Sequence, residues 1–166
     1  GVQTCALPIY AGWHKYLAHY QLQPTAELEG DWSAMSGFQQ TLHMLNGGNL
    51  PTAMLVANDQ MALGVLSALA QLYRTGSQAI SVTGYDDTAD SLYFQPPLTT
   101  VAQDFNVLGK RAVELLIKLM AAPQLKIREL LPTRLIIRQS TWPVTGNGEG
   151  EKDELISQLK ALVEKL

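Results

Sequence analysis

The chain has 166 residues, of which 46% are hydrophobic and 16% are charged, and its formal net charge is −3. An acidic balance of this kind lacks the basic footprint of a domain that binds nucleic acid. The single cysteine cannot form an internal disulfide, which fits a reducing, cytoplasmic location. No run of apolar residues reaches the roughly 18 positions of a membrane-spanning helix, so we expect no membrane partner.

The first ten residues, GVQTCALPIY, follow no hydrophobic period, and we interpret residues 1–10 as a doubtful, non-native segment. From Gly12 onward the pattern becomes regular, with apolar residues at helical spacing alternating with short apolar runs typical of strands. The predicted helices cover residues 12–21, 33–46, 60–73, 104–121 and 152–166. The predicted strands cover residues 26–29, 52–57, 80–85, 98–102 and 134–138.

Three of these helices carry an apolar stripe that predicts the face each one buries. The stripes are Met35, Phe38, Leu42 and Leu45 in the second helix, Ala62, Val65, Leu66, Leu69 and Tyr73 in the third, and Leu108, Ala112, Leu115 and Leu119 in the fourth. Strands that alternate with helices of this length predict an α/β fold with a mostly parallel sheet. The strand at 52–57 is apolar on both faces, as is expected inside such a sheet.

The last part of the chain differs from the rest. Residues 140–150 are rich in glycine and predict a linker between a domain at 11–139 and a separate C-terminal helix at 151–166. Leucines recur in that helix over two heptads, namely Leu155, Leu159, Leu162 and Leu166. A lone helix of about 15 residues is marginal in water, so the leucine stripe is expected to pack against other copies of the chain or against its own domain.

Polar or aromatic pairs follow three of the predicted strands. They are Asp31-Trp32, Asn58-Asp59 and Asp86-Asp87. The carboxyl ends of parallel strands meet at one edge of a sheet, so these residues are expected to converge there. An indole that packs on a sugar ring, together with amide and carboxylate groups for its hydroxyls, is typical of a sugar site.

Each of these residues also has a purely local explanation. Asp31 and Ser33 are good helix caps, and either Asn58 or Asp59 can cap the next helix. Trp32 can belong to the core instead of a ligand platform, and the adjacent pair of aspartates can simply form a turn. The functional interpretation depends on the coincidence at three strand ends.

Signals for an enzyme are weak. His14, His19 and His43 lie inside helical patterns and are interpreted as surface or boundary residues. The glycine-rich phosphate loops and the serine nucleophile motif are missing from the sequence. Adjacent carboxylates such as Asp86 and Asp87 point to different sides of a strand, which does not suit a paired-carboxylate mechanism. We therefore predict no catalytic residue, no metal site and no cofactor.

Several segments resemble the LacI/GalR family of transcriptional regulators. They are GWHKYL, EGDWSAMSGFQQ, PTAMLVANDQMALG, GYDDT, and PPLTT followed by QDF. They lie in order between about residues 11 and 138, roughly three quarters of the chain, and the motifs are long enough to be specific. The resemblance implies part of an effector-binding core with the fold of periplasmic sugar-binding proteins, and thus a binding module rather than an enzyme.

The resemblance also implies particular residues. In the family, the positions of Trp32, Asn58 and Asp86 contact a galactoside inducer, and those of Gln103 and Phe105 line the same cleft. The position of Leu63 lies at the centre of a dimer face, although an exposed leucine is common on protein surfaces. A leucine-heptad helix at the C-terminus joins two dimers into a tetramer, which matches residues 151–166 in pattern only.

The sequence departs from the family pattern in ways that matter. The family binds operator DNA through a headpiece that this sequence lacks, and the N-terminal subdomain is also missing, so we expect a fragment. Ile9 stands where the family has a ligand-binding arginine. The segment from 104 to about 130 belongs in the family to the missing subdomain, so its helix is expected to lack a partner sheet. The alternatives are a sugar-binding protein of a transport system and a Rossmann-type sugar-modifying enzyme.

Overall fold

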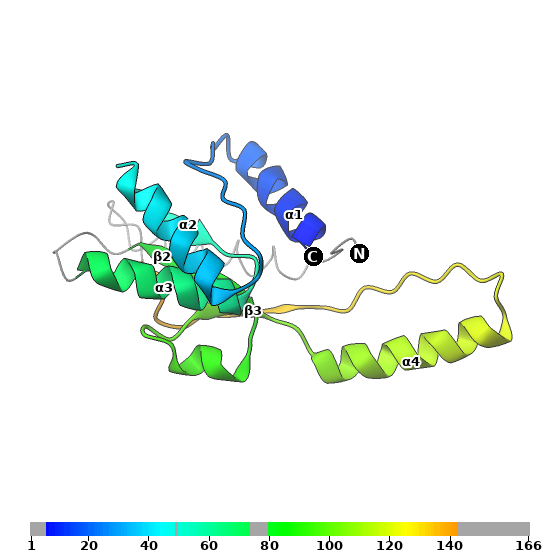
Figure 1. Ribbon diagram of the computed structural model, residues 1–166. Coiled ribbons are helices and arrows are strands. Elements are labelled where there is room, and N and C mark those ends of the chain that lie inside the picture. Colours follow the sequence, from blue (N-terminus) through cyan, green and yellow to red (C-terminus); the bar gives the residue numbers. More distant parts are fainter. Residues whose placement is uncertain (1–5, 49, 74–79, 143–166) are drawn as a thin grey trace, which may run out of the picture.

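A computed structural model describes residues 6–48, 50–73 and 80–142, and Figure 1 shows their arrangement. The helices are α1 (Ala6–His19), α2 (Ala34–Asn46), α3 (Asp59–Tyr73), the short 3-10 helix η1 (Ala89–Tyr93) and α4 (Phe105–Ala121). The strands are β1 (Ala53–Leu55), β2 (Ser81–Asp86), β3 (Thr99–Ala102) and β4 (Arg134–Ile136). No helix in these ranges is long and apolar enough to cross a membrane.

The four strands form one sheet in the order β1-β2-β3-β4. Strands β1, β2 and β3 are parallel, with Thr83 opposite both Leu55 and Thr99, whereas β4 runs antiparallel to β3. The predicted α/β fold with a mostly parallel sheet is therefore confirmed. The parallel strands end at one edge of the sheet, and Asp86 is the last residue of β2 there.

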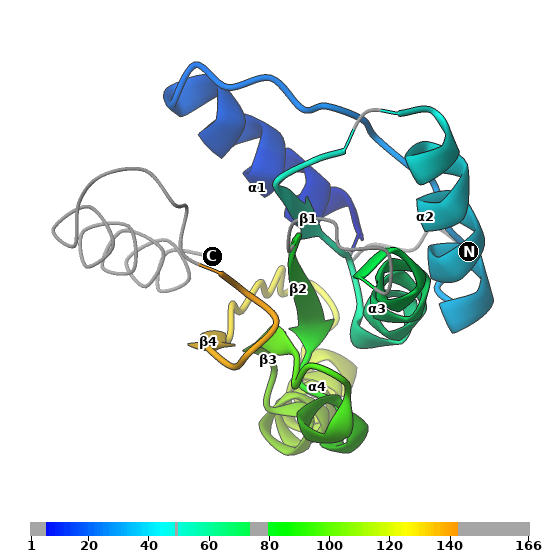
Figure 2. The same ribbon diagram turned by 90° about the vertical axis from the view of Figure 1, so that its left-hand side faces the viewer.

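Helix α3 lies between the sheet and helix α2, as Figure 2 shows. The predicted inner face of α3 is confirmed, since Ala62, Val65, Leu66 and Leu69 are all buried. They pack with Val82 of β2 and with Leu98, which precedes β3, to form the hydrophobic core. The side chain of Tyr73, the last residue of the predicted stripe, lies outside the described residues.

The predicted inner face of α2 is partly wrong. Met35 is 69% exposed, whereas Gly37 and Thr41 are buried. The reason is a close helix crossing, because a Cβ atom on Gly37 would lie 2.2 Å from the carbonyl oxygen of Met61, and one on Gly64 would lie 1.8 Å from that of Ala34. The helices therefore touch through glycines, which a search for large apolar residues overlooks.

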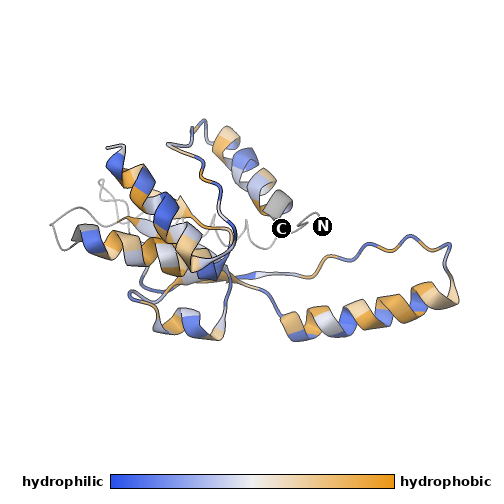
Figure 3. Cartoon of the chain, in the orientation of Figure 1, coloured by the Kyte–Doolittle hydropathy of each residue, from blue (hydrophilic) through white to orange (hydrophobic). Residues whose placement is uncertain are grey.

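Helix α4 projects from the body of the molecule, and the chain returns beside it to β4 (Figure 1). It has no buried residue, although many of its residues are apolar, as the colours of Figure 3 show. Arg111 joins the helix to the returning segment by donating two hydrogen bonds to Glu129, at 2.9 and 2.8 Å. The expectation that α4 lacks a partner sheet stays a prediction.

Two strand predictions are corrected. Residues 26–29 are exposed and belong to no ladder in the described parts of the chain, so the strand predicted there is wrong. Strand β1 is only three residues long, and both Ala53 and Leu55 are exposed. The expectation of burial on both faces fails because β1 lies at the edge of the described sheet.

Structure extends beyond the predicted domain limits at both ends. Helix α1 begins at Ala6, so half of the segment interpreted as non-native is helical, and Pro8 is tolerated because it lies in the first turn. Ser140, predicted as the start of the linker, is buried, and its hydroxyl donates to the carbonyl of Val82 at 2.6 Å. Residues 140–142 thus belong to the fold, and the predicted tail helix at 151–166 lies outside the described residues.

Candidate ligand-binding site

The side chains predicted to converge are held in two hydrogen-bonded pairs. The amide nitrogen of Asn58 donates to the backbone carbonyl of Trp32 at 3.1 Å. The amide nitrogen of Gln103 donates to Oδ1 of Asp86 at 2.9 Å. Phe105, the first residue of α4, is 53% exposed and has no burial against the sheet. Trp32, Asn58, Asp86 and Gln103 are each partly exposed, and a small hollow of about 30 Å³ borders Gln103.

Trp32 sits just before α2 in a left-handed backbone conformation with φ of 73°. Ser33 caps the helix, accepting a hydrogen bond from the N–H of Ser36 at 3.1 Å. Asp31 supports this cap by accepting from both the N–H and the hydroxyl of Ser33, and these hydrogen bonds lower its pKa to about 2. The capping interpretation of this pair is therefore confirmed.

Asn58, and not Asp59, caps helix α3. Oδ1 of Asn58 accepts from the N–H of Met61 at 2.8 Å, while its other amide atom is bonded to Trp32. The choice between Asn58 and Asp59, which the sequence left open, is thus decided by the structure. A single residue starts α3 and also ties the beginning of α2 to it.

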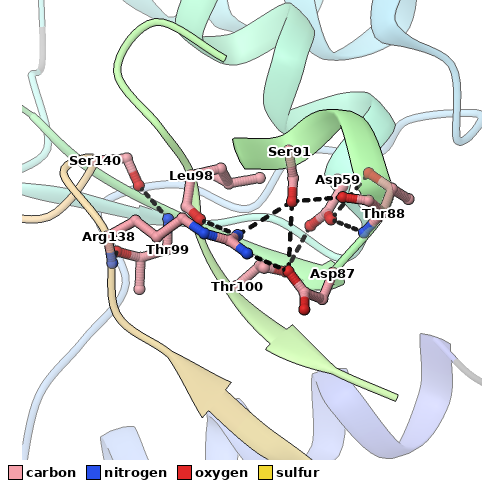
Figure 4. Close-up of polar contacts among 9 residues, drawn as sticks. All are labelled: Asp59, Asp87, Thr88, Ser91, Leu98, Thr99, Thr100, Arg138 and Ser140. Carbon is pink, nitrogen blue, oxygen red and sulfur yellow. Dashed lines mark hydrogen bonds and ion pairs between the residues drawn. The ribbon is translucent and has the colours of Figure 1, made fainter. Parts of the chain in front are cut away.

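Asp59 has a role that sequence reasoning missed. It is fully buried, and its Oδ2 accepts hydrogen bonds from the N–H of Thr88 at 2.8 Å and from its hydroxyl at 3.2 Å. Its Oδ1 accepts from the hydroxyl of Thr100 at 2.6 Å. Figure 4 shows how these bonds connect α3, η1 and β3. The only hint in the sequence was a strand that carries two threonines, Thr99 and Thr100, among apolar residues.

Asp86 and Asp87 face in different directions, as predicted. Both have positive φ values, of 119° and 54°. Asp86 is partly buried, and burial raises its pKa, with the nearby charge of Asp59 adding to the rise and the bond from Gln103 opposing it. Asp87 forms an ion pair with Nη2 of Arg138 at 2.6 Å. Arg138 is a second residue that sequence reasoning treated only as part of a strand.

The histidines match their interpretation as surface or boundary residues. His14 is partly buried and lies 3.2 Å from a carboxylate oxygen of Glu27, while His19 and His43 are exposed. Within the described ranges, the structure contains no group of three or more potential metal ligands.

Sequence comparison places the chain among proteins with a known fold. The family model for the periplasmic binding protein-like domain matches residues 9–141, and the chain belongs to this family. It is 65% identical to the lactose operon repressor of Klebsiella pneumoniae over 156 residues, which cover 94% of this chain and 44% of that protein. It is 56% identical to the lactose operon repressor of Escherichia coli K12 over 131 residues, which cover 79% and 36% of the two chains.

A solved structure shows the same likeness. The crystal structure of the Lac repressor bound to ONPG in the repressed state superimposes with a TM-score of 0.76 and 54% identity, over 82% of this chain and 42% of that one. The resemblance to transcriptional repressors found in the sequence is thus confirmed. The chain spans less than half the length of the relatives it matches.

Proposed function

We propose that this chain is part of the effector-binding core of a sugar-responsive transcriptional repressor of the lactose operon type, and that its effector is a galactoside. The observation that carries the proposal is the 65% identity to a lactose operon repressor over 156 residues. Two contacts support it as well, since Asn58 is hydrogen-bonded to the backbone carbonyl of Trp32 and Gln103 is hydrogen-bonded to Asp86. ONPG, named as the ligand of a similar structure, supports a galactoside.

The side chains have distinct roles in this proposal. The indole of Trp32 packs on the C–H face of the sugar ring, and the carboxylate of Asp86 accepts hydrogen bonds from sugar hydroxyls. Gln103 orients Asp86 and has a second amide hydrogen and a carbonyl left for the ligand. Asn58 likewise keeps one amide hydrogen, and Phe105 offers an exposed aromatic surface beside them.

The described residues supply only one face of a binding cleft. A ligand pocket usually buries most of its ligand, whereas this face is open and the neighbouring helix α4 has no buried residue. We therefore expect this chain to bind a galactoside weakly, with a dissociation constant of roughly 1 mM or above. Burial of most of a sugar's surface requires a second protein face opposite this one.

The comparisons do not favour the two alternative functions. A sugar-binding protein of a transport system would share the fold, and the family description alone allows it. The similar proteins are repressors by name, which argues for gene regulation and against both transport and catalysis. A repressor acts on DNA, so the proposed location is the cytoplasm, with operator contact made by a headpiece that this sequence does not include.

The proposed function also includes self-association of the chain into dimers and tetramers. Leu63 is 37% exposed on α3, while its neighbours Ala62, Val65 and Leu66 are buried and do not need it for the core. This exposure supports Leu63 as the centre of a dimer face. The heptad leucines of residues 151–166 are proposed to join dimers into tetramers.

A titration tests the ligand proposal directly. The ¹⁵N-labelled 166-residue chain is titrated with ONPG, and the indole signal of Trp32 and the side-chain amide signals of Asn58 and Gln103 are followed by NMR. We expect these signals to shift with weak affinity, and we expect Asp86→Ala to abolish the shifts. Asp90→Ala, which removes an exposed carboxylate from η1, is the matched control and should bind as the parent chain does. Unchanged spectra at tens of millimolar ONPG, roughly ten times the expected constant, would rule out galactoside binding by this chain.

A further inference from the structure

The buried carboxylate of Asp59 lies at the junction of three elements. Asp59 is the first residue of α3, and its carboxylate accepts two hydrogen bonds from Thr88, before η1, and a third from Thr100 in β3. All three contacts are donors, so the carboxylate acts only as an acceptor. Thr88 is two residues from Asp86, which means that Asp59 ties down the turn that carries the ligand-site carboxylate.

Gly84 of β2 makes room for this arrangement. A Cβ atom on Gly84 would lie 2.3 Å from Oδ1 of Asp59 and 2.7 Å from a methyl carbon of Leu98. The missing side chain lets the carboxylate approach the backbone of β2 two residues before Asp86. Asp59 is therefore held close to the strand that ends at the site, as well as to the turn that follows it.

The turn needs such support because its backbone is unusual. Asp86 has a φ of 119°, a value that residues other than glycine rarely adopt. Asp87 follows it with a φ of 54°. Conformations of this kind persist only where the surroundings hold them. A second tie comes from Arg138, which donates to Oδ1 of Asp87 at 2.6 Å and to the hydroxyl of Ser91 at 3.1 Å (Figure 4).

We propose that Asp59 is a positioning residue for the ligand site, which fixes the turn at Asp86–Thr88 so that Asp86 presents its carboxylate toward the open face of the sheet. The ligand side of this inference rests on the proposed function. The positioning itself is a property of the free chain and can be measured without ligand.

The first experiment follows the turn in the free, ¹⁵N-labelled chain. Amide exchange at Thr88 and the φ-dependent H–N–Hα couplings of Asp86 and Asp87 are measured in Asp59→Ala and Asp59→Asn. We expect Thr88 to exchange about tenfold faster in Asp59→Ala, with a smaller increase in Asp59→Asn, because the amide is a weaker acceptor than the carboxylate. The couplings of the two aspartates should move toward those of ordinary negative φ values.

A matched pair at Thr100 keeps the test decisive if Asp59→Ala does not fold. Thr100→Val keeps the shape of the side chain but removes the hydroxyl that donates to Asp59, whereas Thr100→Ser retains it. We expect the valine variant to loosen the turn and the serine variant to match the parent chain. The backbone amides of Ala62 and Val82 donate hydrogen bonds to the carbonyls of Asn58 and Ser140. Their exchange rates report whether the whole fold is destabilised.

The outcomes separate positioning from simple stability. If Thr88 exchanges faster only in step with Ala62 and Val82, and the couplings at Asp86 are unchanged, Asp59 merely stabilises the core and the inference is wrong. Binding of ONPG adds a second criterion, since Asp59→Asn should weaken it in the parent chain, whereas the control Asp90→Ala should leave it unchanged. Failure of the parent chain to bind ONPG would contradict the proposed function, while the exchange data would still decide the positioning role.

Discussion

Replacement of Gly64 by alanine tests the helix crossing that brings Trp32 beside Asn58. A Cβ atom on Gly64 would lie 1.8 Å from the carbonyl oxygen of Ala34 and 2.7 Å from the backbone nitrogen of Phe38. Ordinary contact begins near 3.4 Å, so helices α2 and α3 would have to separate locally by about 1.6 Å. The added Cβ would meet backbone atoms of α2, so no side chain can rotate to relieve the contact.

The size of the effect follows from two opposing terms. Forcing an extra methyl group into a packed contact costs typically 1–3 kcal/mol, and a backbone clash belongs at the upper end, about 3 kcal/mol. Alanine regains about 1 kcal/mol relative to glycine through its higher helix propensity. The expected net loss is about 2 kcal/mol, which lowers the melting temperature of a chain of this size by roughly 4–8 °C.

Thermal and urea unfolding followed by circular dichroism measure this loss. Gly109→Ala is the matched control, because Gly109 lies in α4 and an added Cβ would have no neighbour within 4 Å. The control should be as stable as the parent chain or slightly more so. A Gly64→Ala variant as stable as Gly109→Ala would show that α2 and α3 do not cross through Gly64, and the bond between Asn58 and Trp32 would lose its structural basis.

Three further predictions concern assembly and binding. Leu63→Lys should shift the chain toward monomer in sedimentation, because it places a charge on the proposed dimer face, and an unchanged mass would favour an ordinary exposed leucine. Deletion of residues 151–166 should lower the mass in light scattering by half or more and leave the α/β core folded; an unchanged mass with a less stable core would mean that the leucines pack against their own domain. The affinity for ONPG should be at its highest near neutral pH and fall as the pH drops through the pKa of Asp86. This pKa is raised, so the loss should begin at a higher pH than for an ordinary aspartate, and binding that persists at pH 3 would exclude the Asp86 carboxylate as the acceptor.

The sequence by itself determined the class of the fold and the order of most of its helices and strands, although the strand predicted at 26–29 was wrong. Hydrophobic period depends on the geometry of a single helix or strand, so the buried stripe of α3 and the strands β2 and β3 could be predicted from local pattern. Helix caps are equally local, which is why the cap at Ser33 was expected from its sequence neighbours. The motifs also identified the family, whose model matches residues 9–141.

The tertiary structure alone decided how these elements touch. The bond between Thr100 and Asp59 spans 41 positions in the sequence, and that between Arg138 and Asp87 spans 51. Such pairs depend on strand register and on how closely two helices approach. Neither can be predicted from the spacing of apolar residues within a single element. The same reason explains the corrections, since Met35 is exposed because Gly37 and Gly64 form the crossing, and β1 is exposed because it lies at the edge of the described sheet. The choice of Asn58 as the cap, which frees Asp59 to hold the turn at Asp86, is likewise a consequence of packing.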